Sequence, residues 1–107
     1  MRKAQVFYNK QLAGLLEEES RSSYHFRYTD HYYQNRAMPA ISLTLPKTKQ
    51  VYHANQLFPF FYNMLAEGVN KQLQTRQFRI DAEDAFGLLL ATAGNDTIGA
   101  ITVKPLI

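Results

Sequence analysis

The chain has 107 residues, a formal net charge of +3 at pH 7 and no cysteine. This length accommodates one hydrophobic core, and we expect a single domain over residues 1–107. A hydrophobic fraction of 46% with only 20% charged residues excludes an intrinsically disordered chain. The missing cysteine excludes disulfides, thiol catalysis and thiolate metal sites.

Neither the start of the chain nor its interior indicates export or membrane insertion. Residues 1–4 carry two cations, but no apolar run follows them as it does in a secretory signal. No stretch approaches the roughly 18 consecutive apolar residues that a membrane helix needs. We therefore expect a cytoplasmic protein that does not bind membranes.

The first part of the chain predicts a β-hairpin. Residues 5–8 and 12–16 are two apolar stretches separated by Asn9 and Lys10. Asparagine tolerates the left-handed backbone conformation that a tight hairpin turn demands, so we expect the two stretches to pair as strands. Three glutamates follow at positions 17–19, and we expect them to form a solvated strand edge.

Two further strands are predicted before residue 50. Residues 24–29 alternate aromatic and polar side chains with the period of two that is typical of a half-buried strand. Residues 30–36 indicate a short turn or a single helical turn. Residues 39–46 alternate again and predict a fourth strand, which Pro46 ends because proline cannot donate to a sheet ladder.

From Asn55 the apolar residues change to a helical period. They lie three or four positions apart on one stripe, which comprises Leu57, Phe60, Phe61, Met64 and Leu65. This pattern predicts a helix with Pro59 in its first turn, where the missing donor is harmless, and places Phe60 and Phe61 in the core. Residues 69–80 predict a second helix that is less apolar.

The end of the chain predicts one more helix and one more strand. Asp81 is expected to cap the third helix, with Asp84 supporting its start and Gly94 ending it. Residues 99–103 predict the last strand, which Pro105 ends. Strands followed by helices and then a single strand are typical of an α+β domain. We therefore expect a small antiparallel β-sheet with about three helices packed on one side.

Residues that carry catalytic chemistry are not grouped at a readable spacing. His25, His31 and His53 are spaced too irregularly for a local metal pair. The glycine-containing segment 94–99 leads into a strand rather than a helix, so it does not form a phosphate loop. No nucleophile is paired with a base. We expect no catalytic residue, no metal and no cofactor, and therefore a protein that is not an enzyme.

Mild basicity leaves a nucleic-acid-binding module as an alternative function. Its candidate residues are Lys47, Lys49, Arg76 and Arg79 together with the surface tyrosines. These cations do not form the continuous basic stripe of a nucleic-acid binder, so we expect no direct contact with nucleic acid. Binding of a protein partner is favoured, because tyrosines supply large contact areas with a polar group at the tip.

Several segments, kept in order from Ala4 to Pro105, carry a resemblance to a known family. They are residues 26–28 with 39–46, residues 57–68, and residues 86–89 with 94–100. On these motifs the chain resembles the N-terminal subdomain of HipA-type toxin kinases. It departs from the family at Ala66, where proline is common.

The resemblance implies a function as well as a fold. A HipA kinase continues into a catalytic portion with a nucleotide loop and catalytic aspartates, and this chain stops before them. It therefore looks like the HipS antitoxins of tripartite HipBST systems, in which HipT is a separate Ser/Thr kinase and HipB binds DNA. The implied partners are a HipT-type kinase and a HipB-type protein in the same complex. A non-catalytic structural subunit, or a fragment of a longer kinase, are the alternatives.

Under this interpretation the best candidate for contact with the kinase is the turn after the aromatic helix. The candidate partner-binding residues are Asn63, Glu67, Gly68, Val69 and Asn70. Gly68 permits close backbone approach, and the Glu67 carboxylate suits the cationic groups of a phosphate-binding cleft. An ordinary helix end is the alternative for the same residues, since glycine is a normal helix stop.

Overall fold

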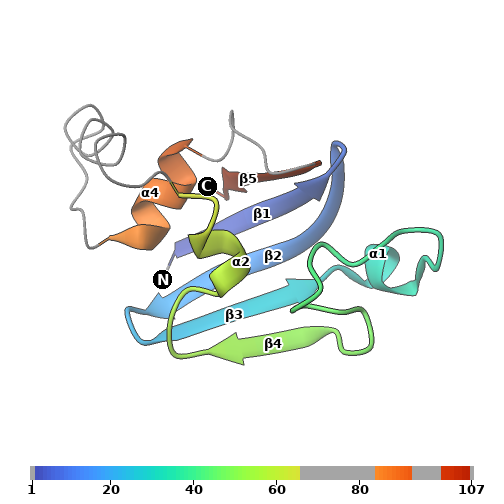
Figure 1. Cartoon of the computed structure of the whole chain (residues 1–107), viewed down its shortest axis with the longest axis horizontal. Coiled ribbons are helices and arrows are strands. Elements are labelled where there is room, and N and C mark those ends of the chain that lie inside the picture. The colour runs from blue at the N-terminus through green and yellow to red at the C-terminus, as the bar shows by residue number, and fades with distance from the viewer. Residues whose placement is uncertain (1, 66–83, 93–99, 107) are drawn as a thin grey trace.

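The central element of the fold is a five-stranded antiparallel sheet (Figure 1). The structure is a computed structural model, and it describes residues 2–65, 84–92 and 100–106. The strands lie in the order β4-β3-β2-β1-β5. Their bounds are β1 Arg2–Tyr8, β2 Gln11–Ser20, β3 Ser23–Tyr28, β4 Val51–Ala54 and β5 Ile101–Pro105. The expected α+β fold with a small antiparallel sheet is confirmed.

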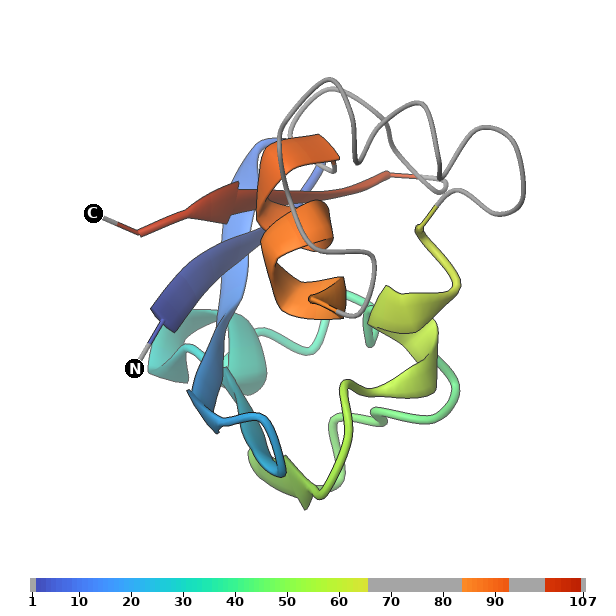
Figure 2. The ribbon, with the colours of Figure 1, turned by 90° about the vertical axis from the view of Figure 1, so that its left-hand side faces the viewer.

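Three helices accompany the sheet within the described residues. They are α1 Asp30–Gln34, α2 Pro59–Tyr62 and α4 Ala85–Thr92. Figure 2 shows α2 and α4 over the same face of the sheet, while α1 lies beyond the end of β3 (Figure 1). The second helix expected over residues 69–80 lies outside the described residues.

The predicted hairpin between β1 and β2 is confirmed. Asn9 and Lys10 both have positive φ, at 48° and 72°, which is the conformation of a two-residue type I′ turn. This turn pairs Tyr8 with Gln11, and the register then carries both strands past the predicted bounds. β5 pairs with the other edge of β1, so the first strand of the chain is flanked by the last.

Alternate residues of the sheet point into the core beneath α2 and α4. The predicted alternation of β3 is confirmed, since Tyr24, Phe26 and Tyr28 are all buried. Phe61 on α2 lies with its ring centroid 5.8 Å from that of Phe26. A β-carbon on Gly14 would lie 2.6 Å from the Phe26 ring, so only glycine leaves room for that ring on β2. Each such side chain contributes about 1.5–3 kcal/mol by burial.

The fourth strand predicted over residues 39–46 is wrong. These residues form an irregular loop, and the fourth strand is β4, Val51–Ala54, which pairs with β3. The alternation arises from a turn instead: the Leu45 amide donates to the Ser42 carbonyl at 3.1 Å, with Leu43 at the apex. Leu43 is 99% exposed, whereas Ile41 and Leu45 on either side are buried.

The predicted helix at residues 55–65 is shorter than its apolar stripe. Only α2, four residues long, is helical, although Pro59 occupies its first turn as expected. The assignment of Phe61 to the core is confirmed, and Phe60 is half-buried against it. Met64 and Leu65 follow in tight turns, because their amides bond three residues back.

The last helix and the last strand begin later than predicted. Asp84 is not helical and caps α4 itself, since its carboxylate accepts a hydrogen bond from the Gly87 amide at 3.0 Å. Asp81, the expected cap, lies outside the described residues. β5 runs to Pro105, which pairs opposite Ala4. Proline is tolerated there because β5 is an edge strand.

Candidate functional site

An open hollow of about 470 Å³ lies between α2, the start of α4 and the β2–β3 hairpin. Its lining combines one cation, two amides, two tyrosines and apolar side chains. The lining residues are Arg21, Tyr24, Gln56, Leu57, Pro59, Tyr62, Asn63 and Ala85. Mixed, open surfaces of this kind suit a segment of another protein. We take the hollow and the exposed end of α2 as the candidate site.

The end of α2 is presented to solvent because the preceding residue is anchored in the core. The Phe61 ring lies 5.2 Å from the Phe60 ring and 5.8 Å from the Phe26 ring, centroid to centroid. Successive helical residues are rotated by about 100°. Anchoring Phe61 inward therefore turns the next side chains outward, and Tyr62 is 47% exposed with Asn63 exposed beside it.

Backbone hydrogen bonds hold Asn63 in place at this position. Its amide donates to the Pro59 carbonyl at 2.9 Å, and the Leu65 amide donates to the Tyr62 carbonyl at 3.1 Å. Asn63 is thus an exposed side chain on an ordered turn, as a contact residue requires. Of the five predicted partner-binding residues it is the one that the structure describes. The others, Glu67, Gly68, Val69 and Asn70, lie outside the described residues, so their contact role stays a prediction.

An ion-pair network secures the wall of the hollow where α4 begins. The Arg2 guanidinium donates to Asp84 at 2.7 and 2.9 Å and to Glu18 at 2.5 and 2.9 Å. It also lies 5.2 Å from the centroid of the Phe86 ring. This single arginine therefore joins β1 and β2 to the N-terminus of α4. Hydrogen bonding to Arg2 lowers the pKa of Asp84, and the same bond raises the pKa of Arg2.

Tyr24 connects this network to the hollow that it lines. Its hydroxyl donates to Glu18 at 2.8 Å, and burial raises the pKa of Tyr24 to about 12. The phenol therefore stays neutral at physiological pH and serves as a hydrogen-bond donor. Each of the four side chains in the network bonds to another member, so together they fix the wall of the hollow where α4 begins.

The sequence interpretation missed Glu18. Positions 17–19 were expected to form a solvated edge, but β2 is a central strand and Glu18 is only 7% exposed. The physical reason is parity: Glu18 points to the same face as Leu16, which is fully buried. Burial of an unpaired carboxylate is costly. The position of Glu18, two residues after the apolar Leu16 on the same strand, therefore indicated that it needs a cation.

Two of the three histidines are brought together by the sheet. His25 and His53 pair across β3 and β4, with ring centroids 4.3 Å apart, and Glu19 lies 3.0 Å from His25 Nε2. His31 is exposed on α1. Within residues 2–65, 84–92 and 100–106, no group of three or more metal-ligating side chains converges.

The cations proposed for nucleic-acid binding do not form a basic stripe in the part that the structure describes. Lys47 donates to two backbone carbonyls, at 2.6 and 2.9 Å. Lys49 lies over the Tyr52 ring, 5.2 Å from its centroid. Arg76 and Arg79 lie outside the described residues. The geometry of the described cations thus adds no support to this alternative.

Comparison with known proteins assigns the family. A sequence model described as the HipA N-terminal domain matches residues 4–104. The chain belongs to the HipA N-terminal domain family. The match is therefore to the N-terminal domain of HipA and not to a kinase catalytic domain.

Known structures and sequences agree with this assignment. A solved structure of the N-terminal domain of HipA toxin is 27% identical, covers 100% of this chain and 94% of its own, and superposes with a TM-score of 0.72. An uncharacterized protein of Haemophilus influenzae is 33% identical over 104 residues, which are 97% of this chain and 92% of that protein. Among the described residues, no helix is long and apolar enough to cross a membrane.

Proposed function

We propose that this HipA N-terminal domain acts in the cytoplasm as a HipS-type antitoxin, which binds a separate HipT-type Ser/Thr kinase and suppresses its activity. The observation that carries the proposal is the family match over residues 4–104, combined with the share of the Haemophilus influenzae protein that aligns with this chain. The aligned domain accounts for 92% of that protein. A relative that consists almost entirely of this domain is what a split toxin–antitoxin system requires. A HipB-type DNA-binding protein is the proposed third member of the complex.

The proposed mechanism is occlusion of the kinase active site, or prevention of its closure, by the turn that follows α2. Phe61 anchors this turn to the core, and Asn63 is exposed on it. The hollow beside Tyr62 and Asn63 offers a place for a segment of the kinase. Glu67 then supplies a carboxylate to the cationic phosphate-binding cleft, and Gly68 allows its close backbone approach.

Co-expression with a separate HipT-type kinase tests the proposal. We expect the two proteins to copurify and the growth arrest caused by the kinase to be relieved. Copurification without relief of growth arrest would make this chain a structural subunit, with neutralisation left to the DNA-binding partner. A failure to associate would contradict the proposal altogether.

A double substitution then tests the assigned contact. Glu67→Ala combined with Val69→Ala is expected to abolish protection of growth while leaving the unfolding transition cooperative. Lys3→Ala with Lys104→Ala is the matched double control, because both side chains lie on the sheet face opposite to α2. Full protection by the Glu67/Val69 variant would show that the turn after α2 is not the inhibitory contact.

A further inference from the structure

Leu43 is the most exposed large apolar side chain among the described residues. It is 99% exposed, while the other large apolar residues with substantial exposure, Tyr62 and Leu106, are 47% and 41% exposed. A leucine left wholly in water contributes nothing to the hydrophobic core. Its position is informative because the neighbouring Ile41 and Leu45 are buried, so the chain directs this one side chain outward.

The turn that carries Leu43 is closed by its own hydrogen bonds. The Leu45 amide donates to the Ser42 carbonyl at 3.1 Å, and the Thr44 amide donates to the Ser42 hydroxyl at 3.2 Å. The Ser42 and Thr44 hydroxyls lie 2.9 Å apart and bond each other. Leu43 therefore stands at the apex of an ordered turn.

Tyrosine hydroxyls fix the segments on both sides of this turn. The Tyr28 hydroxyl accepts a hydrogen bond from the Ile41 amide at 3.1 Å and donates to the Leu45 carbonyl. The Tyr32 hydroxyl donates to the Pro39 carbonyl at 2.6 Å, before the turn. The Tyr52 hydroxyl donates to the Pro46 carbonyl at 2.5 Å, after it. The loop is thereby ordered in advance, which lowers the entropy cost of binding through it.

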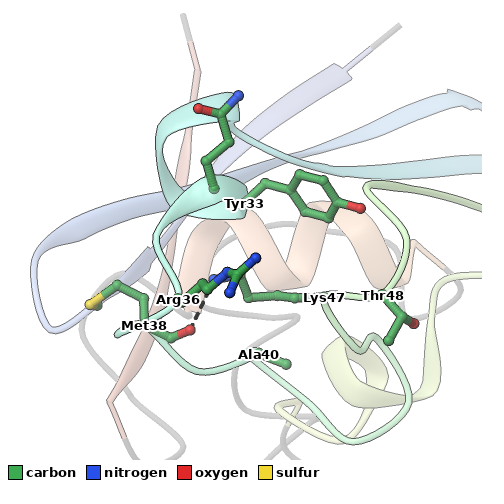
Figure 3. A pocket seen from close by; sticks show the side chains of 7 residues that line it. Tyr33, Arg36, Met38, Ala40, Lys47 and Thr48 are labelled. Carbon is green, nitrogen blue, oxygen red and sulfur yellow. Dashed lines mark hydrogen bonds between the residues drawn. The ribbon is translucent and has the colours of Figure 1, made fainter.

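The base of the loop is cationic. A hollow of about 670 Å³ lies there, and Lys47 donates to the Met38 carbonyl at 2.9 Å. Figure 3 shows Arg36 and Lys47 among the side chains that line it. From residue 35 to residue 54 the sequence contains three cations, Arg36, Lys47 and Lys49, and no carboxylate. Desolvation by burial lowers the pKa of Lys47, and its ammonium stabilises the loop. Arg36 and Lys49 are both exposed, and Lys49 also lies over the Tyr52 ring, 5.2 Å from its centroid.

We propose that the turn at residues 42–45 is a second docking element, which inserts Leu43 into an apolar pocket on the kinase that is flanked by carboxylates. This inference rests on the proposed function and extends it, because the contact lies apart from the turn after α2 in the chain. Apolar insertion supplies the affinity, and the two cations orient the encounter.

Charge argues against a second copy of this chain as the occupant, as far as the described residues extend. Every carboxylate side chain among the described residues already lies beside a cation or a histidine. The pairs are Glu17 with Lys3, Glu18 and Asp84 with Arg2, Glu19 with His25, and Asp30 with Arg27. The described surface therefore offers no uncommitted acidic rim for the cations around Leu43.

The test is the affinity of the full chain for the purified kinase, measured by calorimetry. Leu43→Ala is expected to raise Kd about 10- to 100-fold, the loss that corresponds to one buried leucine side chain. Leu43→Met is expected to keep most of the affinity, because it retains an apolar side chain of similar volume. Leu106→Ala is the control, since Leu106 is also exposed but lies after β5. All variants should melt at the parent temperature, because Leu43 supports no core contact.

The outcomes separate this inference from the proposed function. If the parent chain binds the kinase and Leu43→Ala binds equally well, the docking turn is refuted while the antitoxin proposal stands. If the parent does not bind the kinase, both the docking turn and the antitoxin proposal are refuted. Sedimentation of the chain alone completes the test: a dimer that Leu43→Ala dissociates would identify a second copy as the occupant and overturn the assignment to the kinase.

Discussion

The two ends of β3 are both secured by tyrosine hydroxyls, but the hydroxyls bond to different partners. At the ion-pair end, formed by Arg2, Glu18, Tyr24 and Asp84, the hydroxyl of Tyr24 donates to a carboxylate. At the tyrosine end, formed by Tyr28, Tyr32, Tyr52 and the loop of residues 35–50, the hydroxyls donate to backbone carbonyls. One end thus relies on charge and the other on neutral hydrogen bonds.

The difference shows two ways to order chain segments that are not paired in the sheet. Charge allows one side chain, Arg2, to join three elements, but it makes the contact sensitive to acid and to salt. Neutral phenols require one tyrosine for each carbonyl or pair of groups, and they respond little to pH in the physiological range. Burial raises the pKa of both Tyr28 and Tyr32 to about 12, so they remain donors at all physiological pH values.

The largest effect is expected from Tyr28→Phe at the tyrosine end. This change leaves the Leu45 carbonyl and the Ile41 amide without their shared partner in a buried setting. Each buried group without a partner costs about 1–3 kcal/mol, so the loss of both bonds is expected to lower the free energy of unfolding by about 2–6 kcal/mol. Urea denaturation of the parent and of the variant measures this loss. Tyr33→Phe is the control from the same region, and an equal loss there would contradict the assigned role of the Tyr28 hydroxyl.

A smaller loss is expected from Arg2→Met at the ion-pair end. Removing the guanidinium leaves Glu18 buried without a cation, which costs about 3–5 kcal/mol for a fully buried pair. The Arg2 side chain is 37% exposed, so solvent screening reduces the expected loss to about 1–3 kcal/mol. The neighbouring Lys3→Met removes an exposed pair at 3.7 Å from Glu17 and serves as the control. Similar midpoints of urea unfolding for the two variants would refute the importance of the network.

The ion-pair end should also confer acid sensitivity. Hydrogen bonding to Arg2 holds the pKa of Asp84 below its usual 3.8 in the folded state. The unfolded chain therefore binds more protons near that pH, so this contribution is present above about pH 4 and is lost as the pH falls through the folded pKa. The urea midpoint of the parent, measured at successively lower pH, should show this loss, and the midpoint of Asp84→Asn should show a weaker one. If the urea midpoint of Asp84→Asn fell at low pH as much as that of the parent, the acid sensitivity would belong to other carboxylates.

The smallest of these effects is expected from Tyr52→Phe. Its hydroxyl makes a single bond, to the Pro46 carbonyl at 2.5 Å, and the side chain is only half-buried. Water can replace the lost donor, so we expect a loss of about 0.5–1 kcal/mol. Amide hydrogen exchange of residues 42–45 should rise in Tyr52→Phe and rise further in Tyr28→Phe. The reverse order would show that the turn is ordered chiefly from its C-terminal side.

Local patterns predicted those elements whose cause is local. The type I′ turn at Asn9 and Lys10, the alternation along β3 and the position of Pro59 each depend on a few neighbouring residues. The pattern at residues 39–46 misled because a turn can carry the same alternation of apolar and polar residues as a strand. Here the turn buries Ile41 and Leu45 and exposes Leu43 at its apex. In the candidate site, Asn63 is exposed on the turn after α2, whereas the other four predicted residues lie outside the described part of the chain.

By itself the sequence determined the α+β class, the first hairpin, the aromatic core of β3 and the family, because side-chain period and short motifs encode them directly. Only the tertiary structure decided that Val51–Ala54, rather than residues 39–46, completes the sheet, and that Glu18 is buried against Arg2. Those outcomes depend on partners distant in sequence: Arg2 meets Asp84 across 82 positions, and Tyr28 meets Leu45 across 17. The exposure of Leu43 is such a consequence too, since the tyrosines that hold its turn come from other elements of the fold.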